Sequence, residues 1–404
     1  MTYDVVIVGG GMVGATLSVA LAPLNLRVAL IEAIPHNAAA QPSFDERTTA
    51  LSNGSRRILE TIGVWSALHA FATPIAKIHV SDQGRFGFAR IDASEQGLAA
   101  MGYVLPNRAL GSVLWSRLSS AGIKVFCPAE VSSVAANDEV VKIEITEAGA
   151  KSAIDAKLIV AADGAQSAVR SAFGVAADVR DYGQTAVITT VLPQRFHNNV
   201  AYERFTPSGP LALLPLDGGR CTLVLTLTNE AAQSALAWSD QEFLAEVQRR
   251  FGFRLGRFLK VGRRVPYPLS LTQADRTSAP RCAIIGNAAQ GLHPVAGMGF
   301  NLGLRDAACL AELIAENARN DADPGNLRLL REYDAWRSAD RRGVIAFTDG
   351  LVRLFSNPLS GVTGLRNLGL LAFDLLPPAK SALSRLSTGG GGRVPKLARG
   401  VALT

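Results

Sequence analysis

Three glycines and one acidic residue near the start of the chain have the spacing of a dinucleotide-binding turn. Gly9, Gly11 and Gly14 form G-x-G-x-x-G directly after the apolar run of residues 5–8. The first glycine permits a tight turn, the second lets the backbone approach a pyrophosphate, and the third lets helix and strand pack closely. N–H groups at the helix start then bind the phosphates. Glu32 ends the next apolar run, where a carboxylate binds a ribose and repels a 2′-phosphate. The pattern predicts FAD or NAD rather than NADP.

The same stretch has two simpler interpretations. Residues 5–24 carry no charge and could form a signal or membrane segment. However, Asp4 stands where a signal peptide has basic residues, and the consecutive glycines 9–11 disfavour a spanning helix. The other interpretation is a glycine loop that binds nothing, and the strand–turn–helix context argues against it.

Two further strand ends carry polar residues beside glycine. One apolar run ends in Asp163 and Gly164, and a later one ends in Gly286 and Asn287. In open α/β sheets, ligands bind at the carboxyl ends of the strands. Asp163 could therefore contact a ligand, or it could only cap the helix that follows; the sequence leaves both open.

A loop of small residues follows the later strand end. Residues 294–299 precede a long helix, and such loops let a backbone approach a ligand closely. Amides near Gly297, Gly299 and Asn301 could hold a developing negative charge, such as that on a reduced flavin ring. His293 is a candidate base, although a lone histidine beside a proline is more often structural.

Two arginines are candidates for cofactor contacts. Arg47 lies where the chain returns toward the nucleotide, but its spacing alone favours a surface arginine that caps its own loop. Arg108 falls in the first turn of the helix expected at residues 107–120, with Asn107 as the N-cap. A cation is unfavourable at that end of the helix dipole, so it needs an anionic or carbonyl partner. That partner is either a cofactor or a neighbouring loop.

Composition excludes several classes of protein. The chain has 404 residues, of which 48% are hydrophobic and 19% charged, enough for two domains with cores of their own. The cysteines are far apart without a C-x-x-C, which indicates core residues of a reducing, cytoplasmic protein rather than a disulfide or metal framework. They are Cys127, Cys221, Cys282 and Cys309.

The charge distribution argues against nucleic-acid binding. The formal net charge is +7, and five basic residues without an acidic one follow residue 375. The body of the chain is therefore close to neutral. A fold that binds nucleic acid over its whole surface would carry an excess of positive charge there. The five residues are Lys380, Arg385, Arg393, Lys396 and Arg399.

The order of elements predicts an α/β chain with a strand-rich insert. Residues 181–271 alternate or are rich in β-formers, include the hairpin signal at residues 217–219, and contain an amphipathic helix at 239–251. We expect an antiparallel sheet there, and a turn-rich stretch from about residue 82 to 101. The predicted domains are a nucleotide-binding domain (1–72, 102–178 and 275–330), a substrate domain (73–101 and 179–274) and a C-terminal helical region with a basic tail (331–404).

The C-terminal region combines a charged helix with an apolar, basic stretch. Residues 327–348 predict a helix with a solvated face. From residue 351 the chain is apolar with sparse basic residues, and Pro377-Pro378 interrupts it, so it does not span a bilayer. Such a segment suits a membrane surface or a partner groove, or it packs onto the body as a last helix pair. Residues 389–404 are expected to be flexible.

Taken together, the glycine-bearing stretches resemble the FAD signatures of single-component (group A) flavin aromatic hydroxylases. The likeness covers nearly the whole chain, in the expected order. Within that group, GNAAQGLHPVAGMGFNLGLRD and DERTTALS are similar to the ubiquinone-biosynthesis hydroxylases, in particular the 2-polyprenyl-6-methoxyphenol branch. One departure is Asn287, where the group usually has an aspartate that binds the flavin ribityl chain. Asparagine still offers a carbonyl acceptor.

The resemblance implies a fold and roles for particular residues. The fold is a Rossmann-like FAD-binding domain of the p-hydroxybenzoate-hydroxylase type, with an antiparallel substrate sheet and C-terminal helices. Asp163 and Gly164 match a motif that serves both FAD and NAD(P)H, and Pro294 matches a proline beside the reactive flavin edge. The remaining matches to FAD-contacting positions are Met12, Val13, Arg47, Arg108 and Val131.

The resemblance also implies the reaction. NAD(P)H reduces FAD, O2 forms a flavin C4a-hydroperoxide, and one oxygen atom is delivered to a polyprenylated phenol para to its hydroxyl. The implied partners are that phenol, a membrane surface and other ubiquinone-biosynthesis proteins, with no nucleic acid. The implied location is cytoplasmic, at the inner membrane or in a soluble biosynthetic complex.

Other flavoprotein functions are weighed by their motifs. Disulfide reductases need a second G-x-G-x-x-G and a redox cysteine pair, and flavin halogenases carry W-x-W-x-I-P; the sequence has none of these. Hydroxylation of a small soluble phenol remains an alternative, although it leaves the basic apolar tail unexplained. A non-catalytic FAD-bound scaffold is the other alternative.

Overall fold

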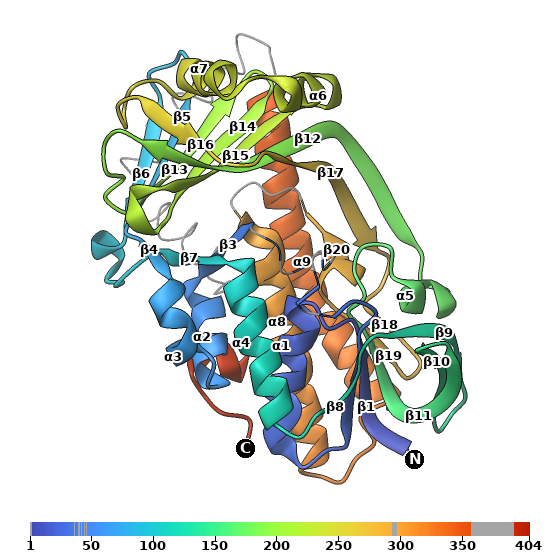
Figure 1. Cartoon of the computed structure of the whole chain (residues 1–404). Coiled ribbons are helices and arrows are strands. Elements are labelled where there is room, and N and C mark those ends of the chain that lie inside the picture. The colour runs from blue at the N-terminus through green and yellow to red at the C-terminus, as the bar shows by residue number, and fades with distance from the viewer. Residues whose placement is uncertain are drawn as a thin grey trace.

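The computed structural model describes residues 2–35, 37, 38, 41, 43, 45, 47–292, 297–356 and 392–404, with the side chains of 351–356 left out. It has the predicted mixed α/β fold, in which two large sheets stand one above the other with a small sheet between them (Figure 1).

The nucleotide-binding half is built on an eight-stranded sheet in the order β18-β19-β11-β1-β2-β8, with β10 on β11 and β9 on β10. Five of these strands, β19, β11, β1, β2 and β8, pair in parallel, so their carboxyl ends meet at one edge. The strands are β1 (Thr2–Val8), β2 (Val28–Ile31), β8 (Lys124–Phe126), β9 (Ala129–Ala136), β10 (Val141–Glu147), β11 (Ala150–Ala161), β18 (Ser278–Ala279) and β19 (Cys282–Ile284).

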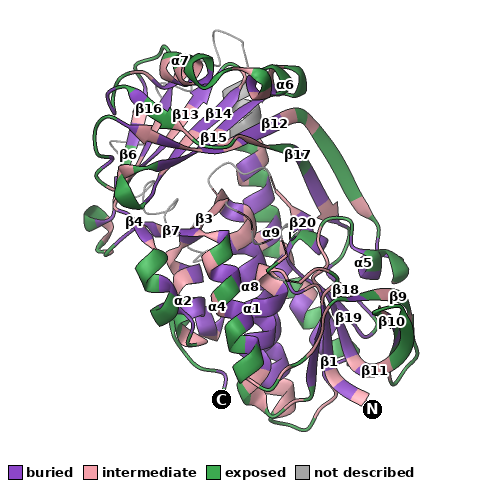
Figure 2. Cartoon of the chain, viewed as in Figure 1, coloured by how far each residue is buried: buried purple, intermediate pink, exposed green. Residues whose placement is uncertain are grey.

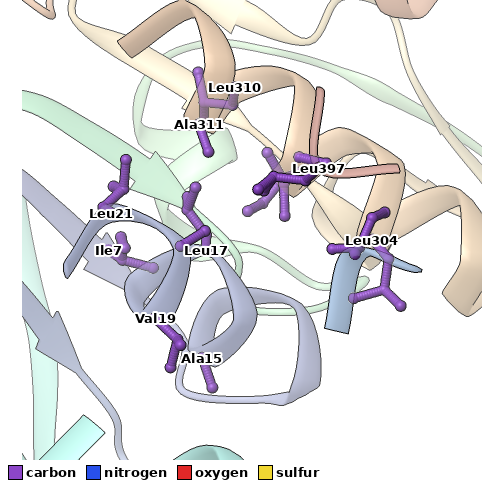
Figure 3. Packing of buried hydrophobic residues seen from close by; sticks show 14 of the residues in the cluster. Ile7, Ala15, Leu17, Val19, Leu21, Leu304, Leu310, Ala311 and Leu397 are labelled. Atoms are coloured by element: carbon purple, nitrogen blue, oxygen red, sulfur yellow. The ribbon is translucent and has the colours of Figure 1, made fainter. Parts of the chain in front are cut away.

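Both faces of this sheet are covered, which explains why its central strands are continuous apolar runs. Ile7 points to a core shared with helices α1, α4 and α8, and Val6 points to the opposite core under β9 and β10. Figure 3 shows Leu17, Leu304 and Leu310 in the first of these cores. The helices of this half are α1 (Met12–Leu21), η1 (Ala22–Leu24), α2 (Asn53–Thr61), α3 (Trp65–Leu68), η2 (His69–Phe71), α4 (Asn107–Ser120), α5 (Ala168–Ala172), η5 (Gly286–Ala288) and α8 (Met298–Ala318).

The second half is a nine-stranded sheet in the order β20-β17-β12-β15-β14-β13-β5-β6, with β16 on β12. It differs from the predicted antiparallel sheet at one pair, because β13 runs parallel to β5. The predicted turn-rich stretch also contains a strand, β6. The strands are β5 (Lys77–Asp82), β6 (Phe88–Asp92), β12 (Ala177–Pro193), β13 (Val200–Thr206), β14 (Gly209–Pro215), β15 (Cys221–Thr228), β16 (Phe258–Val261), β17 (Val265–Ala274) and β20 (Gln290–Gly291).

One face of the nine-stranded sheet is closed by helices. α6 (Asn229–Ala237) and α7 (Asp240–Phe251) lie over it, and Phe243 and Val247 fill the core beneath them (Figure 2). Ser239 begins α7 with a capping box, as its position before the predicted amphipathic helix suggests. The hairpin signal forms η4 (Asp217–Gly219), and η3 (Ser94–Gln96) follows β6.

A three-stranded sheet lies between the halves, in the order β3-β7-β4. Its strands are β3 (Thr48–Ser52), β4 (Thr73–Ile75) and β7 (Gly102–Pro106). Helix α4 begins directly after β7, with Pro106 as its N-cap residue. The expectation that Asn107 is the N-cap is therefore wrong; its side chain instead accepts a hydrogen bond from Thr49.

One prediction for the C-terminal region is confirmed in part and another is corrected. Helix α9 (Leu327–Ser356) has the predicted exposed face, but its opposite face buries Tyr333, Arg337 and Arg341 against α8 and the sheet. The end of the chain, 392–404, is packed rather than flexible: Leu397 of η7 (Lys396–Arg399) is 2% exposed and joins the core of α1 and α8 (Figure 3). Residues 357–391, which carry most of the apolar, basic stretch, lie outside the described residues.

The domain limits expected from the sequence are kept as a proposal. The segments 73–101 and 179–274 supply most of the nine-stranded sheet, but β12 begins at residue 177 and β20 belongs to the later segment. Among the helices that the structure describes, none is both long and apolar enough to cross a membrane.

Candidate functional site

The first glycine turn needs glycine at two of its three positions. Gly9 has φ +104°, and a Cβ there would lie 2.4 Å from the carbonyl oxygen of Ala162. A Cβ on Gly14 would lie 2.0 Å from the carbonyl oxygen of Gly9. Backbone atoms therefore exclude any side chain at these two positions. At Gly11 the nearest obstacle is a side-chain oxygen, that of Ser43 at 2.9 Å.

The turn leaves the start of α1 open for an anion. Gly11 is the N-cap residue, no side chain in the described part of the chain caps this helix, and its first turn has no acidic residue. The first-turn N–H groups, which include those of Met12 and Val13, are the donors that a phosphate uses at a helix start.

Glu32 lies against the glycine turn at the end of β2. Its carboxylate accepts hydrogen bonds from the N–H of Gly10 at 2.5 Å and from the N–H of Ile34 at 2.9 Å. On the other side, the indole of Trp115 in α4 donates to the carbonyl of Gly10 at 2.9 Å. The backbone of Gly10 is thus held at both its N–H and its carbonyl. Sequence reasoning missed Trp115, because no motif connects it to the turn.

The second turn lies directly beside the first. The amide nitrogen of Asp163 is 2.8 Å from where a Cβ on Gly9 would stand, and Gly164 has φ +87°. The carboxylate of Asp163 accepts hydrogen bonds from the hydroxyl of Ser167 at 2.5 Å and the N–H of Val169 at 3.1 Å. The capping role that the sequence left open is therefore present, at the predicted ligand edge.

The third turn packs on α1 through one side chain. A Cβ built on Gly286 would lie 3.2 Å from the methyl groups of Val13, and one on Gly303 would lie 2.9 Å from them. Val13 thus lies between the third turn and α8. Arg170 joins the second and third turns, since its guanidinium donates to the carbonyl of Ala288 at 2.7 Å. The three turns predicted from the sequence meet at one edge, where Asn287 is exposed.

A fully buried carboxylate holds the third turn. Asp306 in α8 accepts hydrogen bonds from the N–H of Gly286 at 3.1 Å, from the amide of Gln290 at 2.5 Å and from the guanidinium of Arg337 at 2.7 Å. Asp306 is 0% exposed and Arg337 2%. Burial acts to lower the pKa of Arg337, but the carboxylates of Asp306 and Asp340 outweigh it and raise the pKa.

Helix α9 contributes more contacts to the backbone around this turn. The hydroxyl of Tyr333 donates to the carbonyl of Ile284 at 3.1 Å. The guanidinium of Arg341 donates to the carbonyls of Ala274 and Ala289 at 3.0 and 3.3 Å. A helix whose charges predict a solvated face therefore positions the strand end and turn that carry Gly286.

The loop that begins α8 is attached to the small sheet by Asn301. Its side-chain N–H groups donate to the carbonyls of Ala50 and Gly297 at 2.8 and 2.7 Å, and its oxygen accepts from the N–H of Ser52 at 2.8 Å. Gly297 has φ +60° and Gly299 lies in the first turn of α8. His293 and Pro294 lie outside the described residues.

The remaining candidates come from the loop before β3, from α4 and from β9. Arg47 pairs with Asp45 at 2.5 Å, as a loop-capping arginine would, and its guanidinium carbon is also 5.0 Å from the ring centroid of Tyr267 in β17. Arg108 is exposed in the first turn of α4. Val131 lies on β9 and packs into the core under β9 and β10.

The cysteines are free thiols, and burial, with Glu32 and Glu147, raises the pKa of the half-buried Cys127. Cys221, Cys282 and Cys309 are buried free thiols, and burial raises the pKa of Cys221 to about 12. Such thiols remain protonated and are poor nucleophiles at neutral pH. Among the described residues, no three acidic, histidine or cysteine side chains are grouped so that they could hold a metal ion.

The glycine turns, the carboxylate of Glu32 and the uncapped start of α1 lie at one edge of the parallel sheet. This arrangement defines a dinucleotide-binding α/β enzyme, here with a second sheet facing that edge. The family described as "FAD binding domain" matches residues 2–348. The chain belongs to this family of FAD-dependent monooxygenases, which use NAD(P)H and O2.

Relatives span almost the full chain. "Ubiquinone hydroxylase UbiL" of Rhodospirillum rubrum is 39% identical over 404 residues, covering 99% of this chain and 93% of that protein. "3-demethoxyubiquinol 3-hydroxylase" of Escherichia coli is 30% identical over 374 residues, covering 92% and 94%. Among solved structures, p-nitrophenol 4-monooxygenase PnpA from Pseudomonas putida shares the fold, with a TM-score of 0.79, 20% identity and coverage of 95% and 97%.

Replacing Gly14 by alanine is expected to abolish FAD retention, because the added Cβ meets the carbonyl oxygen of Gly9 at 2.0 Å. The matched control is Gly343→Ala in α9, where nothing lies within 4 Å of the new Cβ. That change should keep FAD and stabilise the helix by up to about 1 kcal/mol. Flavin absorbance per purified protein measures the outcome, and full FAD content in Gly14→Ala would contradict the role given to the turn.

Replacing Arg337 by methionine leaves the carboxylate of Asp306 buried without its counter-ion. We expect a loss of about 3–5 kcal/mol in the free energy of unfolding. Arg342→Met on the exposed side of the same helix should change it by no more than about 0.5 kcal/mol. Urea unfolding of both variants and the wild type, with and without saturating FAD, tests this. Equal unfolding midpoints for Arg337→Met and the wild type would show that the ion pair does not stabilise the fold.

Proposed function

We propose that this chain is an FAD-dependent hydroxylase of ubiquinone biosynthesis that acts on a polyprenylated phenol. The observation that carries the proposal is full-length similarity at 39% identity to a protein named as a ubiquinone hydroxylase. A second relative, at 30% identity, is named for a hydroxylation of demethoxyubiquinol. The meeting of three glycine turns at one sheet edge supports the FAD-binding part of the proposal.

We assign the cofactor contacts as the sequence predicted them. The N–H groups at Gly11, Met12 and Val13 receive the pyrophosphate. Glu32 binds the adenosine ribose through Oε2, which bonds one backbone N–H and retains a further lone pair, whereas Oε1 accepts from the N–H of Ile34 and from the amide of Gln41. The other assigned positions are Gly9, Gly14, Arg47, Arg108, Val131, Asp163, Gly164, Gly286, Asn287, Gly297, Gly299 and Asn301. Pro294 is assigned to the reactive flavin edge by the resemblance, and His293 is kept as a candidate base.

Bound FAD, reduced by NAD(P)H, supplies the activation of O2. The protein must bind it, orient it and keep water away. The peptide of Gly10, held between Glu32 and Trp115, fixes the pyrophosphate turn. Asp306 fixes the turn at Gly286 in the same way, and Asn301 fixes the start of α8 against β3.

The ring position is the finer part of the proposal. The resemblance of the sequence points to 2-polyprenyl-6-methoxyphenol, hydroxylated para to its hydroxyl. The E. coli relative is named for the 3-position of a demethoxyubiquinol. These two substrates differ in mass and in redox behaviour, so the compound that builds up without the enzyme distinguishes them.

A strain that lacks the gene is expected to lose ubiquinone and accumulate 2-polyprenyl-6-methoxyphenol, which mass spectrometry of lipid extracts detects. Reintroduced wild-type and Gly343→Ala chains should restore ubiquinone, and Gly14→Ala should not. Accumulation of a demethoxyubiquinone would move the reaction to another ring position. Normal ubiquinone with a small phenol accumulating would favour the alternative of a small-phenol hydroxylase.

The scaffold alternative has its own discriminating measurement. A non-catalytic FAD-bound scaffold binds flavin but shows no substrate-stimulated reduction by NAD(P)H. Stopped-flow absorbance of the holoenzyme, with and without a short-chain prenylphenol, separates the two. A hydroxylase reduces its flavin faster with the phenol present.

We also propose that the chain works in the cytoplasm, on the inner membrane surface or within a biosynthetic complex. Lys380, Arg385 and Arg399 support this, because basic residues bind anionic lipid at roughly 1 kcal/mol per charge. Arg393 and Lys396 instead pair with glutamates of α8 and α9. Truncation is a poor test, since Leu397 belongs to the core. The double substitution Lys380→Glu, Arg385→Glu is expected to weaken flotation with anionic vesicles at least tenfold while FAD stays bound.

The matched control reverses two exposed charges elsewhere, Arg57→Glu with Lys142→Glu, for the same change in net charge. It should float like the wild type. Equal flotation of the tail variant and the wild type would show that these two residues do not anchor the chain.

A further inference from the structure

The two faces of the nine-stranded sheet differ in how well they are packed. Across five adjacent strands, the row on the α6–α7 side is buried throughout: His79, Tyr202, Leu213, Leu223 and Thr189. The next row, on the opposite face, is only partly buried at every position: Val80, Glu203, Ala212, Val224 and Ile188. The side chains at the centre of this second face therefore remain partly accessible, although they lie in the middle of the sheet.

This partly accessible face is turned toward the FAD-binding half. Ala201, two residues before Glu203 on the same face of β13, packs with Ile75 and Val104 of the small sheet. On the same face of β15, the hydroxyl of Thr222 bonds that of Thr48 in β3 at 2.8 Å. β3 in turn is bonded to the loop at the start of α8. The face thus forms a wall opposite the predicted flavin contacts.

Glu203 is the one charged residue in this central row. Its cross-strand neighbours are the apolar Val80 and Ala212, and no residue among those described hydrogen-bonds or pairs with its carboxyl group. Burial raises the pKa of Glu203 to about 7. Glu203 is partly accessible on the face turned toward the FAD-binding half, which leaves its carboxyl group within reach of a bound molecule.

We propose that Glu203 binds the hydroxyl group of the phenol substrate and accepts its proton, while the apolar residues of the same row receive the aromatic ring. This rests on the proposed function. The step balances without a further reactant: the phenol O–H bond breaks, the proton passes to a carboxylate oxygen of Glu203, and the electron pair stays on the phenol oxygen. The proton returns when the product leaves.

The chemistry of phenol hydroxylation requires such a group. A phenolate is a stronger nucleophile at its ring carbons than a phenol, and an electrophilic oxygen reacts with those carbons. A free phenol of the tyrosine type has a pKa of about 10, so a base is needed near neutral pH. A carboxylate of raised pKa is better matched to that proton than an ordinary one, and a positioned base contributes roughly 10²–10⁴-fold.

The charged groups around this face are few in the described residues. Asp82 lies further along β5 on the same face, and Lys77 begins that strand and pairs with Asp92. Arg204, the next residue on β13, is directed to the other face, where it bonds Arg250 and Ser81. Arg47 reaches the sheet at Tyr267, and Asp349 of α9 pairs with Arg180.

The test compares the holoenzyme with Glu203→Gln, which keeps the shape and removes the base. The matched control is Glu230→Gln, at an exposed site on the helix-covered side of the same sheet. The probe is 2-geranyl-6-methoxyphenol, and its methyl ether serves as a ligand without the hydroxyl. Binding is followed by the perturbation of flavin absorbance, and hydroxylation by product formation in single turnovers from pH 5.5 to 9.

We expect wild type and Glu230→Gln to bind the phenol at least tenfold more tightly than its ether, and Glu203→Gln to lose that preference. The hydroxylation rate of Glu203→Gln should fall at least 100-fold. The wild-type rate should rise as the pH rises through about 7, where Glu203 becomes ionised, and the variant should lack this limb. Glu203→Asp, which restores a carboxylate, should recover part of the rate.

The outcomes separate this inference from the proposed function. Equal rates and pH profiles in wild type and Glu203→Gln would overturn the role of Glu203 while leaving a hydroxylase. A wild type that binds the phenol no better than its ether would overturn it as well. A wild type that prefers the phenol in a Glu203-dependent way but never hydroxylates it would contradict the proposed function and support Glu203 as the hydroxyl ligand. FAD content of each variant reports correct folding.

Discussion

The buried ion pair between Asp306 and Arg337 is the constraint on which the site depends. A carboxylate at 0% exposure is tolerated only when paired and hydrogen-bonded, and Asp306 accepts from a guanidinium, a side-chain amide and the backbone N–H of Gly286. Arg337 is itself held by Asp340 at 2.7 Å. The pair therefore fixes α8, α9 and the third glycine turn in one arrangement, and it does so by polar geometry that an apolar contact would not specify.

The parts of the fold that the sequence predicted are those encoded by local pattern. Continuous apolar runs identified the parallel strands because these are buried on both faces. The glycines of the first turn were identifiable because Gly9 and Gly14 stand where a Cβ would strike backbone. The amphipathic helix at residues 239–251 and the hairpin at residues 217–219 were likewise local signals. Each of these signals depends on neighbouring residues in the sequence and not on distant segments of the chain.

What the sequence could not predict is long-range. Trp115 holds Gly10 from a helix about a hundred positions away, and nothing in the spacing of either residue signals that bond. The residues around Arg337 in α9 are largely charged and predict a solvated helix. Arg337 is buried because it pairs with Asp306 in α8. The parallel pairing of β13 with β5 and the packing of Leu397 depend on segments that meet only in the folded chain. A charged residue in the sequence predicts an exposed side chain, and this prediction is wrong where the charge pairs with an opposite one inside the protein.

Glu203 differs from these buried charges because its burial is not compensated by a partner among the described residues. The burial of Asp306 is offset by its pairing with Arg337, whereas the carboxyl group of Glu203 has Val80 and Ala212 as cross-strand neighbours, and an apolar side chain there would suit the sheet better. Stability alone therefore does not account for an acidic residue at this position. Residues that lower stability in this way are characteristic of functional sites, where a perturbed ionisable group is kept for the chemistry it performs. A wall that is apolar, partly accessible and turned toward the flavin half gives that carboxyl group a place to act.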